Sequence, residues 1–218
     1  MNYEQMSNNQ LILTGTIIEV PVFSHEVFGE GFYESKIEVA RLSEQVDILP
    51  ITISDRLIIE HDIKVGDKIT VQGQFRSYNK VIEDKSRLML TVFVREIMNE
   101  IDYVSTNDID ITGYICKEPV YRTTPFKREI CDVLLAVNRA YNKSDYIPCI
   151  TWGRNARYIK NLPIGTKINV HGRVQSRVYQ KMDENGEIVN RTAYEVSVSK
   201  IATLDNSEII GIKQENII

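Results

Sequence analysis

The stretch "IGTKINVHGRV" at residues 164–174 is the clearest strand of the chain, because apolar and polar side chains alternate along it. One face would hold Ile168, Val170, Gly172 and Val174, and the other Asn169, His171, Arg173 and Gln175. Alternation with a period of two is typical of a β-strand that buries one face. A matching stretch, "VGDKITVQGQF", stands at residues 65–75. Its recurrence indicates an internal repeat.

The repeat extends along most of the chain. "NQLILTGTI" (9–17) corresponds to "NDIDITGYI" (107–115), "EVPVF" (19–23) to "KEPVY" (117–121), and "DILPI" (47–51) to "DYIPC" (145–149). Each pair is separated by 98 residues. The sequence therefore predicts an N-terminal domain over residues 7–98, a linker over 99–106, a C-terminal domain over 107–204 and a tail over 205–218.

Each repeat unit is dominated by short runs rich in β-branched residues and broken by Gly, Pro, Asn and Asp, which predicts strands. One helix is expected near residues 155–162, ending before Pro163. The order is three strands, a helix and two strands, which is that of the OB fold, a five-stranded Greek-key barrel. We therefore predict an all-β protein with two tandem OB folds. Glycines at equivalent positions are expected at bulges or tight bends: Gly15, Gly73, Gly113 and Gly172.

Composition excludes several classes of protein. The 218 residues are 43% hydrophobic and 26% charged, which is ordinary for a globular chain. No apolar run reaches the roughly 20 residues of a membrane helix, and "MNYEQMSNNQ" does not resemble a signal peptide. The sequence thus predicts a cytoplasmic protein without a membrane segment.

Metal binding, cofactor binding and catalysis are not indicated. The three cysteines (Cys116, Cys131, Cys149) have no CxxC spacing, and the three histidines (His25, His61, His171) are isolated. Structural zinc sites need such spacing, so buried, reduced thiols are expected. No phosphate-binding loop and no nucleophile motif is present. We expect no metal, no cofactor and no enzymatic activity.

Charge separates the two halves. Residues 1–106 hold 10 Lys and Arg against 17 Asp and Glu, a net charge of −7. Residues 107–204 hold 15 against 10, a net charge of +5, so the overall −4 conceals a basic second domain. Phosphate neutralisation is local and requires only a basic face. The second domain can supply one.

The second domain resembles the bacterial single-stranded DNA-binding protein family. The resemblance rests on five motifs in order: "NDIDITGYICKEPVYR", "LLAVNRAY", "DYIPCITWGRNARYI", "LPIGTKINVHGRVQSRVY" and "YEVSVSKIATL". Two such domains in one chain resemble the variant in which a homodimer supplies four OB folds. The resemblance implies binding of single-stranded DNA, and replication or repair proteins as further partners. The family's acidic tail has no counterpart in "LDNSEIIGIKQENII".

The resemblance also implies site residues. Its base-stacking positions fall on Tyr141, Tyr146, Trp152 and Tyr179, and its phosphate-binding positions on Arg122, Arg154 and Arg177. Other basic positions of the family fall on Ile164, Gln175 and Val178, which implies a weaker hold on phosphate.

Strand geometry, independently of the family, adds Arg173 to the candidate site and leaves open whether Trp152 lies in the core. Arg173 shares its side of the fourth strand with Arg177 and Tyr179, because alternate residues share a face. Tyr146 and Trp152 also share a face, about 20 Å apart. A lone Trp in a strand is ordinarily a core residue, and alternation alone does not decide which face of this strand is inside.

The first domain is a poorer candidate for binding. Its equivalents of the stacking positions are Gln45, Ile48, Ser54 and Tyr78, so Tyr78 is a single, weaker candidate. With its net charge of −7, we expect it to bind nucleic acid weakly, to build the oligomer or to contact another protein. The aromatic loop over residues 25–35 is a further candidate contact with a strand.

Two functions follow. The favoured one is sequence-nonspecific binding of single-stranded DNA during replication, repair or recombination, in association with the nucleoid. The alternative is an OB-fold interaction module, similar to those of replication restart, with secondary affinity for nucleic acid. Stacking tolerates either sugar, so RNA remains a candidate ligand alongside DNA.

Overall fold

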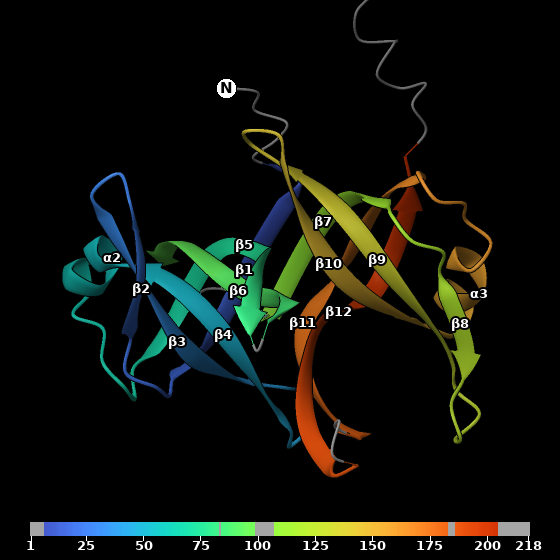
Figure 1. Ribbon diagram of the computed structural model, residues 1–218, viewed down its shortest axis with the longest axis horizontal. Helices are drawn as coiled ribbons and strands as arrows, with labels where there is room; N and C mark the ends of the chain where they lie inside the picture. The colour runs from blue at the N-terminus through green and yellow to red at the C-terminus, as the bar shows by residue number, and fades with distance from the viewer. Residues whose placement is uncertain (1–6, 83, 99–106, 183–185, 205–218) are drawn as a thin grey trace, which may run out of the picture.

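The computed structural model describes residues 7–82, 84–98, 107–182 and 186–204 (Figure 1). The first half contains β1 (Asn9–Ile17), β2 (Val22–Val27), β3 (Glu30–Ala40), β4 (Val46–Ser54), α2 (Asp55–Glu60), β5 (Lys68–Ile82) and β6 (Lys85–Met98). The second half contains β7 (Asn107–Ile115), β8 (Val120–Thr123), β9 (Glu129–Arg139), β10 (Lys143–Trp152), α3 (Gly153–Ile159), β11 (Lys167–Met182) and β12 (Ile188–Thr203).

Each half closes into a barrel with the strand order of an OB fold. In the first half β1 pairs with β3 and β5, β3 with β4, β5 with β6, and β4 runs parallel to β6. The second half repeats these pairings with β7, β9, β10, β12 and β11. The helices α2 and α3 follow the third barrel strand of each half, as predicted. The prediction of two OB folds is confirmed.

A short additional strand distinguishes each half from the five-strand pattern. β2 pairs with β3 alone and β8 with β9 alone, so both form outer edges of the sheet. All six residues of β2 are exposed. A strand that buries neither face carries no alternating hydrophobic pattern, which is why periodicity did not reveal these edges.

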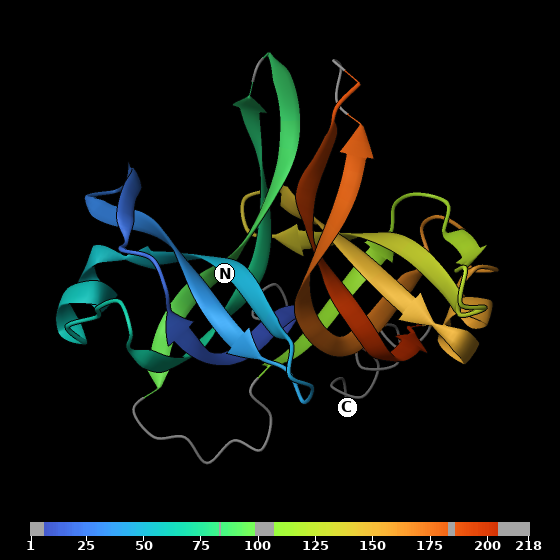
Figure 2. The same ribbon diagram turned by 90° about the horizontal axis from the view of Figure 1, so that it is seen from below.

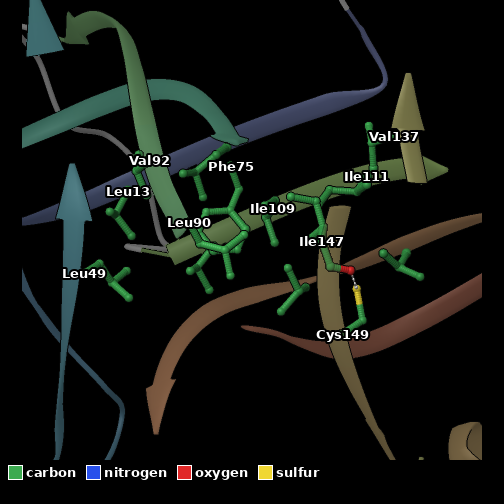
Figure 3. Packing of buried hydrophobic residues seen from close by; sticks show 14 of the residues in the cluster. Leu13, Leu49, Phe75, Leu90, Val92, Ile109, Ile111, Val137, Ile147 and Cys149 are labelled. Atoms are coloured by element: carbon green, nitrogen blue, oxygen red, sulfur yellow. Dashed lines mark hydrogen bonds between the residues drawn. The ribbon is translucent and has the colours of Figure 1, made fainter. Parts of the chain in front are cut away.

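The two barrels form one body. β1 and β7 pair antiparallel, with Leu11 opposite Ile109, and these two residues occupy equivalent positions of the repeat. The pairing therefore places an approximate two-fold axis between the halves. The apolar core is continuous across this junction: Phe75 and Leu90 of the first barrel lie close to Ile109 of the second (Figure 3).

Two buried carboxylates fasten the junction at equivalent positions. Asp47 accepts hydrogen bonds from Arg41 Nε (2.7 Å) in its own barrel and from the backbone N–H of Ser176 (2.7 Å) in the other. Asp145 likewise accepts from Arg139 Nη1 (3.2 Å) and from the backbone N–H of Ser77 (2.8 Å) across the junction.

Both carboxylates are removed from solvent, with 0% exposure for Asp47 and 2% for Asp145. Burial raises the pKa of Asp145, although Ser77 and Arg139 oppose that shift. We call these groups the Asp47 clasp (Asp47, Arg41, Arg173, Ser176) and the Asp145 clasp (Asp145, Arg139, Ser77).

Glycine is required where the fourth strand of each barrel bends. The register shifts between Gln72 and Gly73 in β5 and between His171 and Gly172 in β11, which confirms the bulges predicted at Gly73 and Gly172. Gly15 and Gly113 pair with the neighbouring strands without a register shift. A Cβ atom at Gly172 would lie 2.2 Å from the carbonyl oxygen of Ser197 on the paired strand. Only a residue without Cβ allows this approach.

Replacing Gly172 with alanine is expected to lower the free energy of unfolding by about 1 to 3 kcal/mol, because the neighbouring backbone must move. Urea unfolding followed by circular dichroism measures the loss. An unchanged urea midpoint would contradict the prediction, because it would show that β12 moves away from the new Cβ atom without a loss of stability.

None of the helices in the described ranges is long and apolar enough to cross a membrane.

Candidate nucleic-acid interface

A groove of about 540 Å³ lies on the outer face of the second barrel. Its floor is formed by β8, β9 and β10, including Val120, Leu134 and Pro148. One wall is the β11–β12 hairpin, with Arg177 and Tyr179. The opposite wall comes from the first barrel, where β6 contributes residues 88–90. The groove is thus built by both halves of the chain.

Three of the predicted stacking residues are exposed on β10 and β11, and of these Tyr179 lines the groove. Tyr146 and Trp152 of β10 are 44% and 39% exposed, and Tyr179 is 37% exposed. Pro148 lies between the first two on the same side of β10 and lines the groove, whereas Ile147 and Cys149 belong to the buried core cluster. Trp152 is therefore a surface residue rather than a core residue, which answers the question left open by alternation.

Tyr141 lies apart from the strands, at the turn between β9 and β10. It is 85% exposed, and both Tyr141 and Asn142 adopt positive φ angles (61° and 53°). Such backbone is uncommon for non-glycine residues and typical of tight hairpin turns. The turn presents the ring to solvent at the end of the strand that carries Tyr146.

The predicted arginines are mostly paired with carboxylates. Arg122 Nη2 lies 2.7 Å from Asp132, and Arg177 Nε lies 3.3 Å from Glu195, whose hydrogen bond raises the pKa of Arg177. These pairs fix each guanidinium beside the groove. An arginine has five N–H donors, so donors remain for a phosphate.

The other two predicted arginines differ from each other. Arg173 Nη1 lies 3.5 Å from Asp47 and belongs to the Asp47 clasp, so it faces the first barrel. Arg154 is exposed at the start of α3, and no ion pair within the described ranges involves it. Of the four arginines, Arg154 is the one most available to an anion.

Tyr78 of the first domain has a different setting. Its hydroxyl donates to Glu34 Oε1 (3.2 Å), and burial, followed by the charge of Glu34, raises the pKa of Tyr78. A carboxylate beside the ring repels phosphate. Tyr78 thus differs from Tyr179, whose ring centroid lies 5.7 Å from the guanidinium of Arg177.

Sequence reasoning missed the wall from β6. Residues 88–90 belong to the first repeat unit, and their apolar pattern is that of any barrel strand. No local signal could have assigned them to the groove, because the contact depends on how the two barrels are joined.

Within the described ranges no group of three or more His, Cys, Asp or Glu side chains could hold a metal ion. The three cysteines are unpaired; burial raises the pKa of Cys131 to about 11 and also raises that of Cys149.

The chain consists of two joined OB folds, and the second carries exposed aromatic side chains beside a groove. These features define an OB-fold protein of the class that binds single-stranded nucleic acid. A search against protein families agrees: the model of the single-strand binding protein family matches residues 106–204. The chain belongs to this family.

Curated relatives support the assignment, and a solved structure has the same fold. Single-stranded DNA-binding protein 1 of Staphylococcus aureus (strain COL) is 30% identical over 117 residues, which cover 50% of this chain and 70% of the relative. Single-stranded DNA-binding protein 2 of Listeria monocytogenes is 31% identical over 119 residues, covering 50% and 72%. The wild-type single-stranded DNA binding protein from Thermus aquaticus has the same fold, with a TM-score of 0.69 at 18% identity, over 91% of this chain and 93% of that one.

Proposed function

We propose that this protein binds single-stranded DNA without reading its sequence and protects it during replication, repair or recombination. Membership of the single-strand binding protein family supports a binding role rather than an enzymatic one. The observation that carries the proposal is the exposed aromatic face of β10, with Tyr146 and Trp152, beside the groove lined by Tyr179.

Binding would combine stacking with phosphate contacts. Every base has a π face, so stacking on Tyr146, Trp152 and Tyr179 holds a strand regardless of sequence. Tyr141 extends this row at the turn. The phosphates would be held by the arginines beside the face: Arg122, Arg154, Arg177 and, at the edge facing the first barrel, Arg173.

The first test is a fluorescence titration with a short oligothymidylate, because Trp152 is the only tryptophan. We expect strong quenching on binding. If three or four phosphates are neutralised, affinity should fall about 20- to 50-fold between 50 and 200 mM salt. The conservative variant Trp152→Phe should still bind in a gel-shift assay but lose the signal. Absence of binding at low salt would contradict the proposed function; an equal affinity for oligouridylate would extend it to RNA.

We further propose a homodimer with four OB folds, located at the nucleoid in the cytoplasm. The resemblance to the variant with two OB folds per chain supports it, and the exposed edges β2 and β8 are free in one chain to meet a neighbour. Analytical ultracentrifugation should give twice the mass of one chain. The mass of a single chain at micromolar concentration would contradict the dimer.

An exposed hairpin of the first barrel supports a second candidate function, which is contact with another protein. Its β2–β3 hairpin exposes apolar side chains, as does Val20 just before it; those of the hairpin are Val22, Phe23, Val27 and Phe28. Glu26 and Glu30 accompany them, which disfavours nucleic acid at this hairpin. This is the observation that supports an interaction module alongside DNA binding.

A further inference from the structure

Two equivalent strands, β2 and β8, form the outer edges of the sheet. β2 pairs only with β3 and β8 only with β9, so each leaves the backbone N–H and C=O groups of one edge without a strand partner within the described ranges. Such an edge is a template on which another strand can form hydrogen bonds. Figures 1 and 2 show β2 (blue) and β8 (yellow-green) near opposite ends of the molecule. A partner strand for either edge must therefore come from another molecule.

The two edges differ in charge. Residues 19–30, here called the β2 segment, contain β2 and the turn after it; residues 117–128, the β8 segment, are their equivalent 98 positions later. The β2 segment holds three Glu and no Lys or Arg, a net charge of −3. The β8 segment holds four Lys and Arg against one Glu, a net charge of +3. Equivalent strands of the repeat thus carry opposite charges.

Part of this charge is available to a partner. Glu26 on β2 and Lys127 and Arg128 in the turn after β8 are exposed, and no ion pair among the described residues involves them. The other charges of the two segments have partners in the chain or offset each other: Glu19 pairs with Lys36, Glu30 with Arg56 and Arg122 with Asp132, and Lys117 precedes Glu118. The β2 segment therefore still presents a negative charge, and the β8 segment a positive one.

Both segments also expose apolar side chains. Val22 and Phe23 of β2 and Val120 of β8 are more than half exposed. The turn after each strand carries a phenylalanine at the equivalent position, Phe28 and Phe126, and both rings are almost fully exposed. Removing apolar surface from water favours association. Each edge thus offers backbone hydrogen bonds, apolar area and a charge that the other edge complements.

We infer that the β2 edge of one copy of this chain pairs with the β8 edge of a second copy, which joins the two molecules head to tail. Contacts between like edges would bring charges of the same sign together, which costs binding energy, so the charges select the unlike pair. The inference rests on the proposed homodimer and names its contact surface. Because the contact joins unlike surfaces, it leaves one β2 edge and one β8 edge free, and further copies add as the concentration rises.

The test reverses the charge of one edge at a time in the full-length chain. Glu26→Lys with Glu30→Lys makes the β2 segment basic, and Lys127→Glu with Arg128→Glu makes the β8 segment acidic. Each double variant alone is expected to self-associate at least about 10-fold more weakly than the natural protein in sedimentation velocity at low salt. An equimolar mixture of the two should regain the association, because every edge then meets an edge of opposite charge.

The matched control reverses exposed charges away from both edges. Glu96→Lys on β6 and Lys200→Glu on β12 should each leave the association unchanged. Raising the salt from about 0.1 to 1 M should weaken association of the natural protein, because the Debye length falls from about 10 to 3 Å. A mixture of the two double variants that associates no better than each variant alone would overturn the inference.

The outcomes separate the edge contact from the proposed homodimer. If the natural protein dimerises and neither double variant alters the dimer, the edge contact is overturned and the homodimer stands. If the natural protein keeps the mass of one chain at micromolar concentration and low salt, both are overturned. Hydrogen exchange tests strand pairing directly: amides of residues 22–27 and 120–123 should exchange more slowly at concentrations where the chain associates, and unchanged exchange in both strands would overturn the inference.

Discussion

Replacing Asp47 with alanine is expected to lower the free energy of unfolding by about 3 to 5 kcal/mol, because removing one partner of a buried ion pair leaves the other uncompensated. Asp47 has no exposed surface, and its loss would strand Arg41 and the backbone N–H of Ser176. Since Ser176 belongs to the other barrel, the clasp holds the halves together. Urea unfolding followed by circular dichroism measures the effect.

The matched control is Asp132→Ala. Asp132 pairs with Arg122 on the surface, where both side chains are more than a third exposed. Exposed pairs contribute about 0 to 1 kcal/mol, so this variant should unfold nearly like the natural protein. If both variants lose the same free energy of unfolding, burial of the Asp47 clasp adds nothing to stability. Asp47→Asn should fall between the two, because the amide retains an acceptor for Ser176.

The double variant Trp152→Ala, Tyr179→Ala is expected to abolish most binding of single-stranded DNA. Each stacked base contributes about 1 to 3 kcal/mol, so each substitution should weaken binding about 5- to 150-fold. The two residues lie on different elements, β10 and β11, and their effects should combine. Fluorescence anisotropy of a labelled oligothymidylate is the suitable measurement, since the tryptophan is removed.

Tyr158→Ala controls for the loss of an exposed aromatic ring. Tyr158 is 45% exposed on α3, where its hydroxyl hydrogen-bonds with Thr203 Oγ1 (3.2 Å), and it does not line the groove. The affinity of the Tyr158→Ala variant for the oligothymidylate should equal that of the natural protein. If Tyr158→Ala weakens binding as much as the double variant, the bound strand follows a different face of the barrel.

The two barrels should also unfold together. Their strands pair through β1 and β7, their cores are continuous, and two clasps cross the junction. The relative position of the β5–β6 and β11–β12 hairpins, and hence the width of the groove, depends on these contacts. We therefore expect substitutions at these contacts to lower both the free energy of unfolding and the affinity for DNA.

Local patterns were sufficient for the two barrels, although not for the edge strands β2 and β8. Period-two alternation in residues 164–174 and its recurrence at 65–75 predicted the strands, and the order of elements predicted both OB folds. The predicted helix over 155–162 lies at Gly153–Ile159 in the structure, because Trp152 ends β10 directly at the helix start. The predicted linker and tail, residues 99–106 and 205–218, lie outside the described residues.

The site was only partly accessible from sequence. The resemblance and the parity of β10 indicated Tyr146 and Trp152 on one face, yet alternation could not decide whether Trp152 was inside. Its 39% exposure follows from the barrel, which buries Ile147 and Cys149 instead. The ion pairs of Arg122 and Arg177 were also hidden, since their partners stand 10 and 18 residues away on neighbouring strands.

The sequence by itself determined the repeat, the strand order, the two barrels and the chemical character of one face, because all of these depend on interactions between near neighbours or on a pattern repeated along the chain. Only the tertiary structure decided the clasps and the second wall of the groove. Asp47 meets Ser176 across 129 positions, and Leu88 faces a groove floored by the other repeat unit. Such contacts are fixed by how the two barrels dock, and docking depends on the summed shape and charge of surfaces that no single stretch of sequence contains.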